Sequence, residues 1–282
     1  MNENRILLCG LPASGKTTFL AALWHLVSQR EVPTTLSLGA WPKHREYLNE
    51  LSRKWSRFVP FDRTPTDEVQ EISIHLKDGT THIDLHVPDM SGETWEALWS
   101  TRSCGDDAAK WAQTASGIML FLHADRIRPP LEIMTCKEMA EASGETPPQT
   151  NPTPWSPESS PTQVILVDII QSLTLPPLGS NGRRLAVMIS AWDKAEDAGM
   201  TPDDYLRVHL PLLQQFLCCS GSFSKVKVFG VSALGGDLDS KTDSDRLKAE
   251  DVPSKRIRVV EGDHMDALHD LTIPVQWLIA RG

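Results

Sequence analysis

Cysteine and long apolar runs are both scarce in this chain of 282 residues. The five cysteines show neither paired metal-ligand spacing nor the even number of a disulfide framework, so we expect reduced thiols. The apolar run at 6–9 is too short for a signal peptide, and no run approaches the roughly 20 apolar residues of a membrane span. We therefore expect a cytoplasmic protein that does not insert into a membrane.

An excess of basic side chains is also missing. The chain has 28 Lys and Arg against 37 Asp and Glu, which gives a formal net charge of −9. A general binder of nucleic acid or anionic membranes would need a basic face, so direct nucleic-acid binding is not expected. Hydrophobic residues make up 40% of the chain and charged residues 23%, which suits a globular protein with a sizeable core.

Short apolar runs and helical periodicities alternate along the chain. The apolar runs predict buried strands at 5–9, 116–123, 184–190 and 225–231, with a further edge strand at 255–261. Apolar residues at helical spacing predict helices at 17–30, 164–175, 201–219 and 271–281. Period-2 alternation on both sides of Lys77-Asp78-Gly79-Thr80 predicts a hairpin. This order indicates a three-layer α/β sandwich with a mostly parallel sheet and one antiparallel edge strand.

Two segments interrupt the alternation, and we interpret the chain as one domain, 1–282, with two insertions. The first, at about 40–60, carries Leu48, Leu51 and Trp55 at helical spacing, which predicts an inserted amphipathic helix. The second, at about 129–163, is rich in Pro, Ser and Thr and has almost no apolar periodicity in its second half. That composition is typical of a mobile loop.

The strongest motif is Gly10-Leu-Pro-Ala-Ser-Gly15-Lys16-Thr17, which matches GxxxxGK[ST] between a predicted strand and a predicted helix. Glycines allow backbone N–H groups to turn toward phosphates, and the helix N-terminus adds its positive dipole end. Lys16 would neutralise the β- and γ-phosphates, and the Thr17 hydroxyl would bind Mg²⁺. The candidate phosphate-binding residues are Gly10, Ala13, Ser14, Gly15, Lys16, Thr17 and Thr18.

A second motif, Asp89-x-x-Gly92, follows the returning strand of the hairpin. Asp89 is in a position to hold Mg²⁺ through water, and Gly92 to offer its N–H to a γ-phosphate. A plain turn is the alternative interpretation of four such residues. The hairpin favours the functional interpretation, because most P-loop kinases lack one before this aspartate.

Two further segments concern the base. Ser190-Ala191-Trp192-Asp193 follows the next-to-last core strand, and an aspartate there would accept two N–H bonds from guanine that adenine cannot supply. The segment resembles the Asn/Thr-Lys-x-Asp motif of GTPases, with Ser190 in place of Asn or Thr and Ala191 in place of the lysine that lies along the base. The resemblance then implies that Lys194 or Trp192 covers the base instead. Ser232-Ala233 ends the last core strand, in the order expected for a backbone contact to the guanine oxygen. A structural cap remains the alternative for Asp193.

Taken in order, these segments resemble the small-GTPase-like class of P-loop proteins over nearly the whole chain. GLPASGKTTFLAALWHL, DMSGE, SAWDK and the closing DLTIPVQWL are similar to bacterial double-GTPase type domains. The resemblance implies a Ras-like architecture, GTP and GDP as ligands, Mg²⁺ as cofactor, and protein partners in a conflict or phage-defence system.

The same resemblance requires a switch threonine before the hairpin, which would contact both Mg²⁺ and the γ-phosphate. Thr66 is our first candidate and Thr64 the second, with Thr34 and Thr35 as alternatives after the first helix. Glu93 stands where many GTPases place a glutamine that orients the attacking water; a solvated acid at a helix N-terminus is the other interpretation. Arg63 and Arg102 are candidates for a cationic finger or ordinary surface arginines.

The leading functional hypothesis is a magnesium-dependent GTPase in which residues 60–68 and 89–104 change conformation with the nucleotide. Ala191 and Glu93 leave open a nucleotide-binding scaffold or sensor that has lost turnover. A P-loop ATPase or small-molecule kinase is the third hypothesis, and the hairpin and Asp193 disfavour it. Trp95 and Trp99 share one helix face, which would serve either the core or a partner surface.

Overall fold

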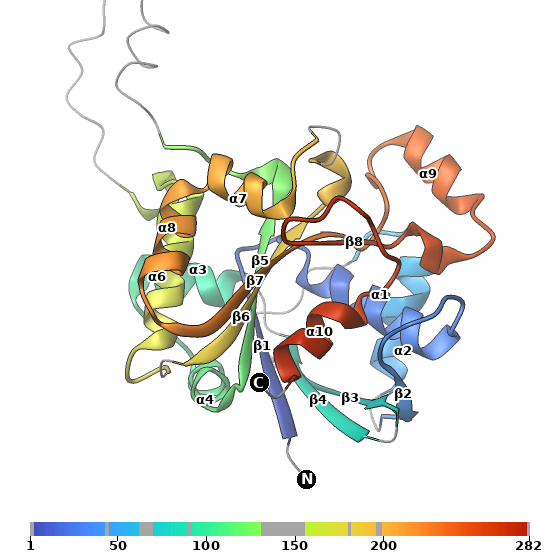
Figure 1. Ribbon diagram of the computed structural model, residues 1–282, viewed down its shortest axis with the longest axis horizontal. Helices are drawn as coiled ribbons and strands as arrows, with labels where there is room; N and C mark the ends of the chain where they lie inside the picture. Colours follow the sequence, from blue (N-terminus) through green and yellow to red (C-terminus); the bar gives the residue numbers. More distant parts are fainter. Residues whose placement is uncertain are drawn as a thin grey trace, which may run out of the picture.

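An eight-stranded sheet forms the centre of the protein (Figure 1). The computed structural model describes residues 3–42, 45–61, 70–79, 81–89, 92–130, 156–179, 182–195 and 199–280. The strands lie in the order β2-β3-β4-β1-β5-β6-β7-β8. Their bounds are β1 Glu3–Cys9, β2 Ser37–Ala40, β3 Gln70–Asp78, β4 Thr81–Asp89, β5 Gly117–His123, β6 Arg183–Ser190, β7 Phe223–Ser232 and β8 Arg258–Glu261.

The five central strands, β4, β1, β5, β6 and β7, are parallel. Strands β5 and β6 are buried almost throughout, because helices cover both faces of the sheet. Since parallel strands end at the same edge of a sheet, the segments that follow β1, β5, β6 and β7 converge there. This edge carries the residues that the sequence assigns to a nucleotide.

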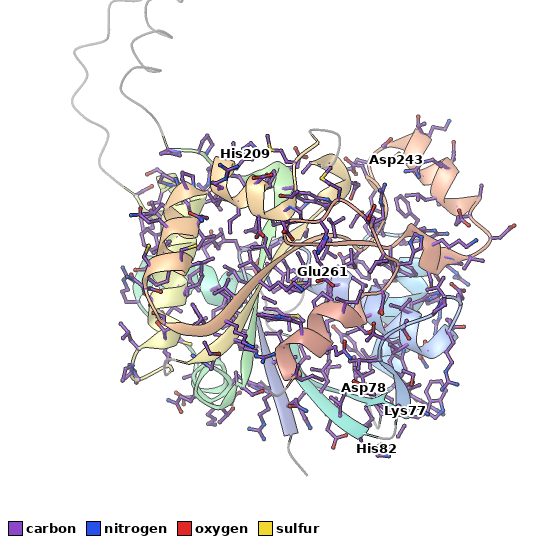
Figure 2. All side chains as sticks on the ribbon, viewed as in Figure 1. Lys77, Asp78, His82, His209, Asp243 and Glu261 are labelled. Atoms are coloured by element: carbon purple, nitrogen blue, oxygen red, sulfur yellow. The ribbon has the colours of Figure 1, made fainter. Side chains whose placement is uncertain are left out.

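Antiparallel pairs close the sheet on both sides. Strands β3 and β4 form the predicted hairpin, with pairs from Gln70↔Asp89 to Asp78↔Thr81. Its turn, marked by Lys77, Asp78 and His82 in Figure 2, lies at the opposite end of the molecule from Asp243. Beyond the hairpin, β2 adds an edge strand for which the sequence shows no signal, and β8 pairs antiparallel with β7.

Two layers of helices complete the expected sandwich, and the predicted fold class is confirmed. One core lies under α1, α2 and α10, and the other under α3, α4, α6, α7 and α8 (Figure 1). The helix bounds are α1 Lys16–Gln29, α2 Arg45–Ser56, α3 Gly92–Thr101, α4 Asp106–Thr114, α6 Thr162–Thr174, α7 Pro202–His209, α8 Pro211–Cys219, α9 Lys241–Lys248 and α10 Thr272–Ile279. None of the helices in the described ranges is both long and apolar enough to cross a membrane.

Helix α2 lies within the segment for which the sequence predicts an inserted helix. It buries Leu48, Leu51 and Trp55 against α1, as their spacing requires. The prediction of a single helix at 201–219 is wrong in one respect, because this segment forms two helices, α7 and α8. Pro211 has no N–H to donate, and Leu210 leaves the helical region with φ −136°. Residues 131–155 of the proline-rich insertion lie outside the described residues.

A buried carboxylate joins the two sides of the chain next to α10. Asp270 is 6% exposed, and its oxygens accept hydrogen bonds from the hydroxyls of Thr35 (2.7 Å) and Thr272 (2.6 Å). The backbone N–H groups of both threonines donate to it as well. The Asp270 side chain therefore accepts hydrogen bonds from four donors, and these bonds connect the segment before β2 to the start of α10.

Asp270→Ala should lower the free energy of unfolding by about 2–4 kcal/mol, because it leaves buried donors without an acceptor. Chemical denaturation measures the change. The matched control is Asp266→Ala at an exposed position of the same loop, which should stay within about 0.5 kcal/mol of the wild type. Equal stability of the two variants would show that the four hydrogen bonds contribute little.

Candidate nucleotide-binding site

The segment between β1 and α1 forms a tight loop, the P-loop, residues 10–17. Gly10, Ala13 and Gly15 adopt positive φ angles of 146°, 56° and 96°. A Cβ atom on Gly10 would lie 2.4 Å from the Phe121 carbonyl oxygen, so the first glycine is required by the neighbouring strand β5. The loop therefore has the backbone shape that its glycine spacing predicts.

Lys16, the first residue of α1, folds back over this loop. Its Nζ atom donates to the carbonyl oxygens of Gly10 (2.8 Å) and Leu11 (3.1 Å) and to Oγ of Ser14 (3.2 Å). The side chain is nearly buried, with 7% of its surface exposed. A positive charge thus lies inside the P-loop, where a phosphate would be held.

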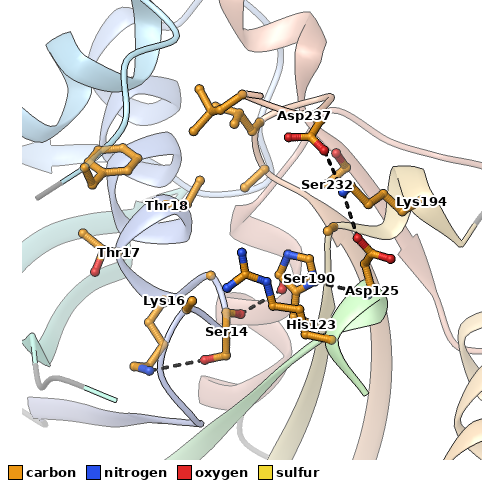
Figure 3. A pocket seen from close by; sticks show the side chains of 18 of the residues that line it. Ser14, Lys16, Thr17, Thr18, His123, Asp125, Ser190, Lys194, Ser232 and Asp237 are labelled. Carbon is orange, nitrogen blue, oxygen red and sulfur yellow. Dashed lines mark hydrogen bonds and ion pairs between the residues drawn. The ribbon is translucent and has the colours of Figure 1, made fainter. Parts of the chain in front are cut away.

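A cavity of about 690 Å³ opens in front of the P-loop (Figure 3). This volume lies within the roughly 300–1,000 Å³ range of small-molecule and cofactor sites. Its lining comprises residues 12–18, 60–61, 92–93, 123, 125–126, 190–191, 193–194, 232–234 and 236–239. The predicted phosphate-binding residues of the P-loop lie in this lining except Gly10, whose carbonyl oxygen accepts from Lys16, and so do Asp193, Lys194, Ser232 and Ala233.

The start of α3 touches the P-loop backbone. A Cβ atom on Gly92 would lie 2.3 Å from the backbone nitrogen of Pro12 and 2.7 Å from the carbonyl carbon of Leu11. Only glycine permits this approach, which brings the second motif into the cavity beside the first. Glu93 lines the same wall.

Four of the candidate residues are described only in part or not at all. Asp89 is the last residue of β4, and its backbone pairs with Gln70. The Asp89 side chain lies outside the described part of the structure, as do Arg63, Thr64 and Thr66. Their roles stay predictions.

A serine joins the P-loop to the base end of the cavity. Ser190, at the end of β6, donates its hydroxyl to the carbonyl oxygen of Ser14 at 2.8 Å. A Cβ atom on Gly15 would lie 2.9 Å from the Ser190 Cβ atom, so the two segments are in direct contact. Ser190 therefore supports the P-loop from the position where the class usually has Asn or Thr.

The two base motifs are bonded to each other. Ser232 Oγ, at the end of β7, donates to a carboxylate oxygen of Asp193. The same hydroxyl oxygen accepts a hydrogen bond from the Gly235 N–H at 3.1 Å. The structure thus brings together two segments that the sequence places only by their order.

Trp192 does not cover the base. Its side chain is 1% exposed, packs edge-on against Tyr205 with ring centroids 5.6 Å apart, and lies so close to Gly230 that a Cβ atom there would meet it at 2.4 Å. Of the two residues expected to cover the base, Lys194 and Trp192, the prediction for Trp192 is wrong, because the left-handed turn at Ala191 directs its side chain into the core.

Lys194 lies at the rim of the cavity between two carboxylates. Its Nζ atom contacts Asp237 at 2.8 Å and Asp125 at 2.9 Å (Figure 3). These two hydrogen bonds hold the pKa of Lys194 above its usual range, and the lysine lowers the pKa of each carboxyl in return. The ammonium group therefore connects the segments after β5, β6 and β7.

Other predicted candidates lie away from the cavity lining. Arg102 forms an ion pair with Asp168 and lies over the Trp99 ring, which favours the interpretation as an ordinary surface arginine. Thr35 donates to Asp270, next to α10. Trp95 is fully buried, and the indole N–H of Trp99 donates to the Pro157 carbonyl at 3.2 Å, which favours the core interpretation of both.

Sequence reasoning missed His123, Asp125 and Arg126 of the lining, whereas Pro60 and Phe61 lie at the start of the segment 60–68 that it predicts as a switch. His123 ends β5, and Asp125 and Arg126 follow it. Burial lowers the pKa of His123, and the charges of Arg126 and Lys194 lower it further. The one available signal was that 123–126 lies at the end of a buried strand, where polar residues reach the edge of the sheet.

The Double-GTPase 1 family matches this chain over residues 7–278. The chain belongs to that family, and so to the P-loop GTPases, as its motifs predict; the family membership supports binding of GTP. The comparison with curated proteins finds no match.

Two solved structures are similar to the chain at a distance. The Arl6 (BBS3) small GTPase of Trypanosoma brucei, solved with the nucleotide analogue GppNp, has 14% identity and a TM-score of 0.37, with 87% of this chain and 94% of that one covered. The Roco2 RocCORΔC protein of Methanosarcina barkeri, solved with GDP, has 15% identity and a TM-score of 0.36. There the match covers 88% of this chain and 48% of that one.

Lys16→Ala should weaken GDP binding at least tenfold, or roughly 1.4 kcal/mol, because it removes the charge held inside the P-loop. Titration with a fluorescent GDP analogue measures this change. Lys110→Ala, on the exposed face of α4, is the control and should bind as the wild type does. Unchanged affinity in Lys16→Ala, with an unchanged circular dichroism spectrum, would contradict the P-loop assignment.

Proposed function

We propose that this protein is a GTP-binding and GTP-hydrolysing switch that uses Mg²⁺ and acts with partner proteins. One observation carries the proposal: the P-loop, the start of α3 and the bonded Asp193–Ser232 pair line a single cavity of about 690 Å³. Phosphate-binding, γ-phosphate-sensing and base-reading groups are thus within one ligand's reach.

The phosphate end of the cavity suits a Mg²⁺-bound triphosphate. Lys16 supplies a nearly buried positive charge, and the Thr17 residue lines the wall beside it. Asp89 ends β4 at the same sheet edge, because β4 runs parallel to β1. A hydroxyl and a carboxylate are the oxygen ligands that Mg²⁺ prefers. When bound, the ion would neutralise charge on the phosphate oxygens.

The base end suits guanine. The Asp193 carboxylate would accept the N1–H and N2–H donors of the base, while adenine offers an unprotonated nitrogen there. Ser232 holds one oxygen of that carboxylate, and Ala233 lines the same cavity, where its N–H would donate to the guanine O6 atom. Lys194 remains beside the base as a lining residue, although its charge is engaged by Asp125 and Asp237.

Hydrolysis requires a water molecule at the γ-phosphate, next to Gly92. The water oxygen attacks the γ-phosphorus, the bond to the β–γ bridging oxygen breaks, and GDP and inorganic phosphate form. Glu93 lines this wall and would orient the water through its carboxylate, with Thr66, or Thr64, supplying the hydroxyl that senses the γ-phosphate. We infer these roles by analogy with other P-loop GTPases.

A cytoplasmic switch with protein partners in a bacterial conflict or phage-defence system is the setting that the double-GTPase resemblance implies. A scaffold that binds GTP without turnover is the second candidate, since Glu93 places a negative charge near the phosphate where a neutral amide is usual. Release of phosphate from GTP by the purified protein distinguishes the two.

Gly92→Ala tests the switch. The added Cβ atom would overlap the P-loop at Pro12, and the P-loop is fixed between β1 and α1, so the start of α3 should move away. The affinity for a non-hydrolysable GTP analogue should fall at least tenfold, or roughly 1.4 kcal/mol, while the affinity for GDP changes less than about threefold. GTP turnover should fall with it.

The matched control is Gly105→Ala. Gly105 precedes α4 much as Gly92 begins α3, but a Cβ atom there meets nothing within 4 Å. Isothermal titration of both variants with both nucleotides gives the comparison. A Gly92→Ala protein that loses GDP and the GTP analogue equally, or loses neither, would contradict γ-phosphate sensing by α3.

A further inference from the structure

The inserted helix α2 contacts the loop that carries Ala233. Trp55, in the last turn of α2, is fully buried. Its indole N–H donates to the carbonyl oxygen of Ala233 at 2.8 Å, a bond between residues 178 positions apart in the chain. An insertion that belongs to none of the four nucleotide-binding segments predicted from the sequence therefore holds the backbone of one of them, Ser232-Ala233.

A second contact supports the same loop. Gly235 has a φ angle of 85°, and a Cβ atom on it would lie 2.7 Å from the carbonyl oxygen of Arg256. Arg256 in turn lies over the Trp55 ring at 6.0 Å, and its Nη1 atom donates to the Ser56 carbonyl at 2.9 Å. The end of α2 and the turn Pro253–Arg256 thus form one platform under the loop.

The Trp55 ring is itself fixed. His25 of α1 stacks at a tilt against it with centroids 4.7 Å apart, and Nδ1 of His25 shares a hydrogen bond of 3.0 Å with the Ser52 hydroxyl. Burial lowers the pKa of His25, although the nearby Glu31 opposes the shift. The His25 ring is thus held by its contacts, and the indole has a fixed wall to pack against.

Ala233 consequently lies between two anchors. On one side, the Ser232 hydroxyl is bonded to Asp193 and to the Gly235 N–H. On the other, Trp55 holds the Ala233 carbonyl. The Ala233 N–H lies between these bonds along the chain, so we expect both of them to restrict its direction. An N–H donor aimed at the base favours a carbonyl oxygen such as O6 of guanine and disfavours the amino group of adenine.

We propose that Trp55 is a positioning residue for base selection, and that its indole N–H fixes the Ala233 N–H toward the guanine O6 atom. This inference rests on the proposed guanine-nucleotide function. It assigns the inserted helix α2 a role in base specificity, although α2 carries none of the nucleotide-binding segments predicted from the sequence.

Trp55→Phe tests the inference, because it keeps an aromatic ring and deletes the donor. The probes are GDP and 6-thio-GDP, which retains both donors for Asp193 and replaces O6 with a sulfur atom, a weaker acceptor. In the wild type GDP should bind more tightly than 6-thio-GDP. In Trp55→Phe the affinity for GDP should fall about fivefold while that for 6-thio-GDP changes less than twofold. The selectivity for oxygen is thereby reduced.

Trp24→Phe is the matched control. Trp24 is also fully buried, and its indole N–H also crosses to α2, where it donates to Asn49 Oδ1 at 3.0 Å. It should therefore lose the same kind of bond without changing either affinity. Equal weakening of GDP and 6-thio-GDP in Trp55→Phe, or equal effects of the two variants, would overturn the positioning role.

A comparison of nucleotides in the wild type and a second variant at position 55 complete the test. A wild type that binds ADP as tightly as GDP contradicts the proposed function, whereas a wild type that prefers GDP but binds 6-thio-GDP equally well contradicts only this inference. If Trp55→Phe does not fold, a benzothienylalanine incorporated at position 55 keeps the shape of indole without the donor. It should show the same selective fivefold loss for GDP.

Discussion

Three glycines let separate parts of the chain touch the P-loop, and the rest of the site depends on those contacts. Gly10 lies against the Phe121 carbonyl at the end of β5, Gly15 against Ser190 at the end of β6, and Gly92 against Pro12. A side chain at any of the three would overlap a neighbour. Because these close approaches surround one loop, the P-loop, the start of α3 and the segment that carries Asp193 line a single cavity.

The polar contacts of the site extend this arrangement. Ser190 bonds the P-loop to β6, Ser232 bonds Asp193 to β7, and Lys194 joins Asp125 to Asp237. The lysine and both carboxylates are about a third or more exposed, so their ion pairs contribute little to stability. Their effect is geometric, since they hold the segments that follow β5, β6 and β7 next to one another at the rim of the cavity.

Much of the fold could be predicted from the sequence, because its signals are local. The P-loop glycines, the hairpin turn and the continuous apolar strands each depend on a few adjacent residues. Pro211 also indicates a break in the helix, but the apolar spacing of 201–219 led to the prediction of a single helix. Strand β2 could not be predicted, since four residues with no clear alternation become a strand only by pairing with β3.

The site was predictable where function requires a motif and not where tertiary contacts decide. Trp192 was placed at the base because it adjoins Asp193, but the left-handed turn at Ala191 sends it into the core. Asp125 and Asp237 meet Lys194 only across the sheet, and Trp55 meets Ala233 only because α2 packs behind it. Contacts between residues so far apart in the chain leave no spacing pattern from which they could be predicted.

The most direct test of guanine recognition is titration of Asp193→Asn with GDP and with xanthosine diphosphate. Asparagine offers a donor where the carboxylate has only acceptors, and xanthine offers a carbonyl oxygen in place of the guanine amino group. The wild type should prefer GDP, and the variant should prefer xanthosine diphosphate, each by at least about tenfold, or roughly 1.4 kcal/mol. Equal loss of both nucleotides in the variant would instead mean that Asp193 serves only to hold Ser232, and guanine recognition by this cavity would be contradicted.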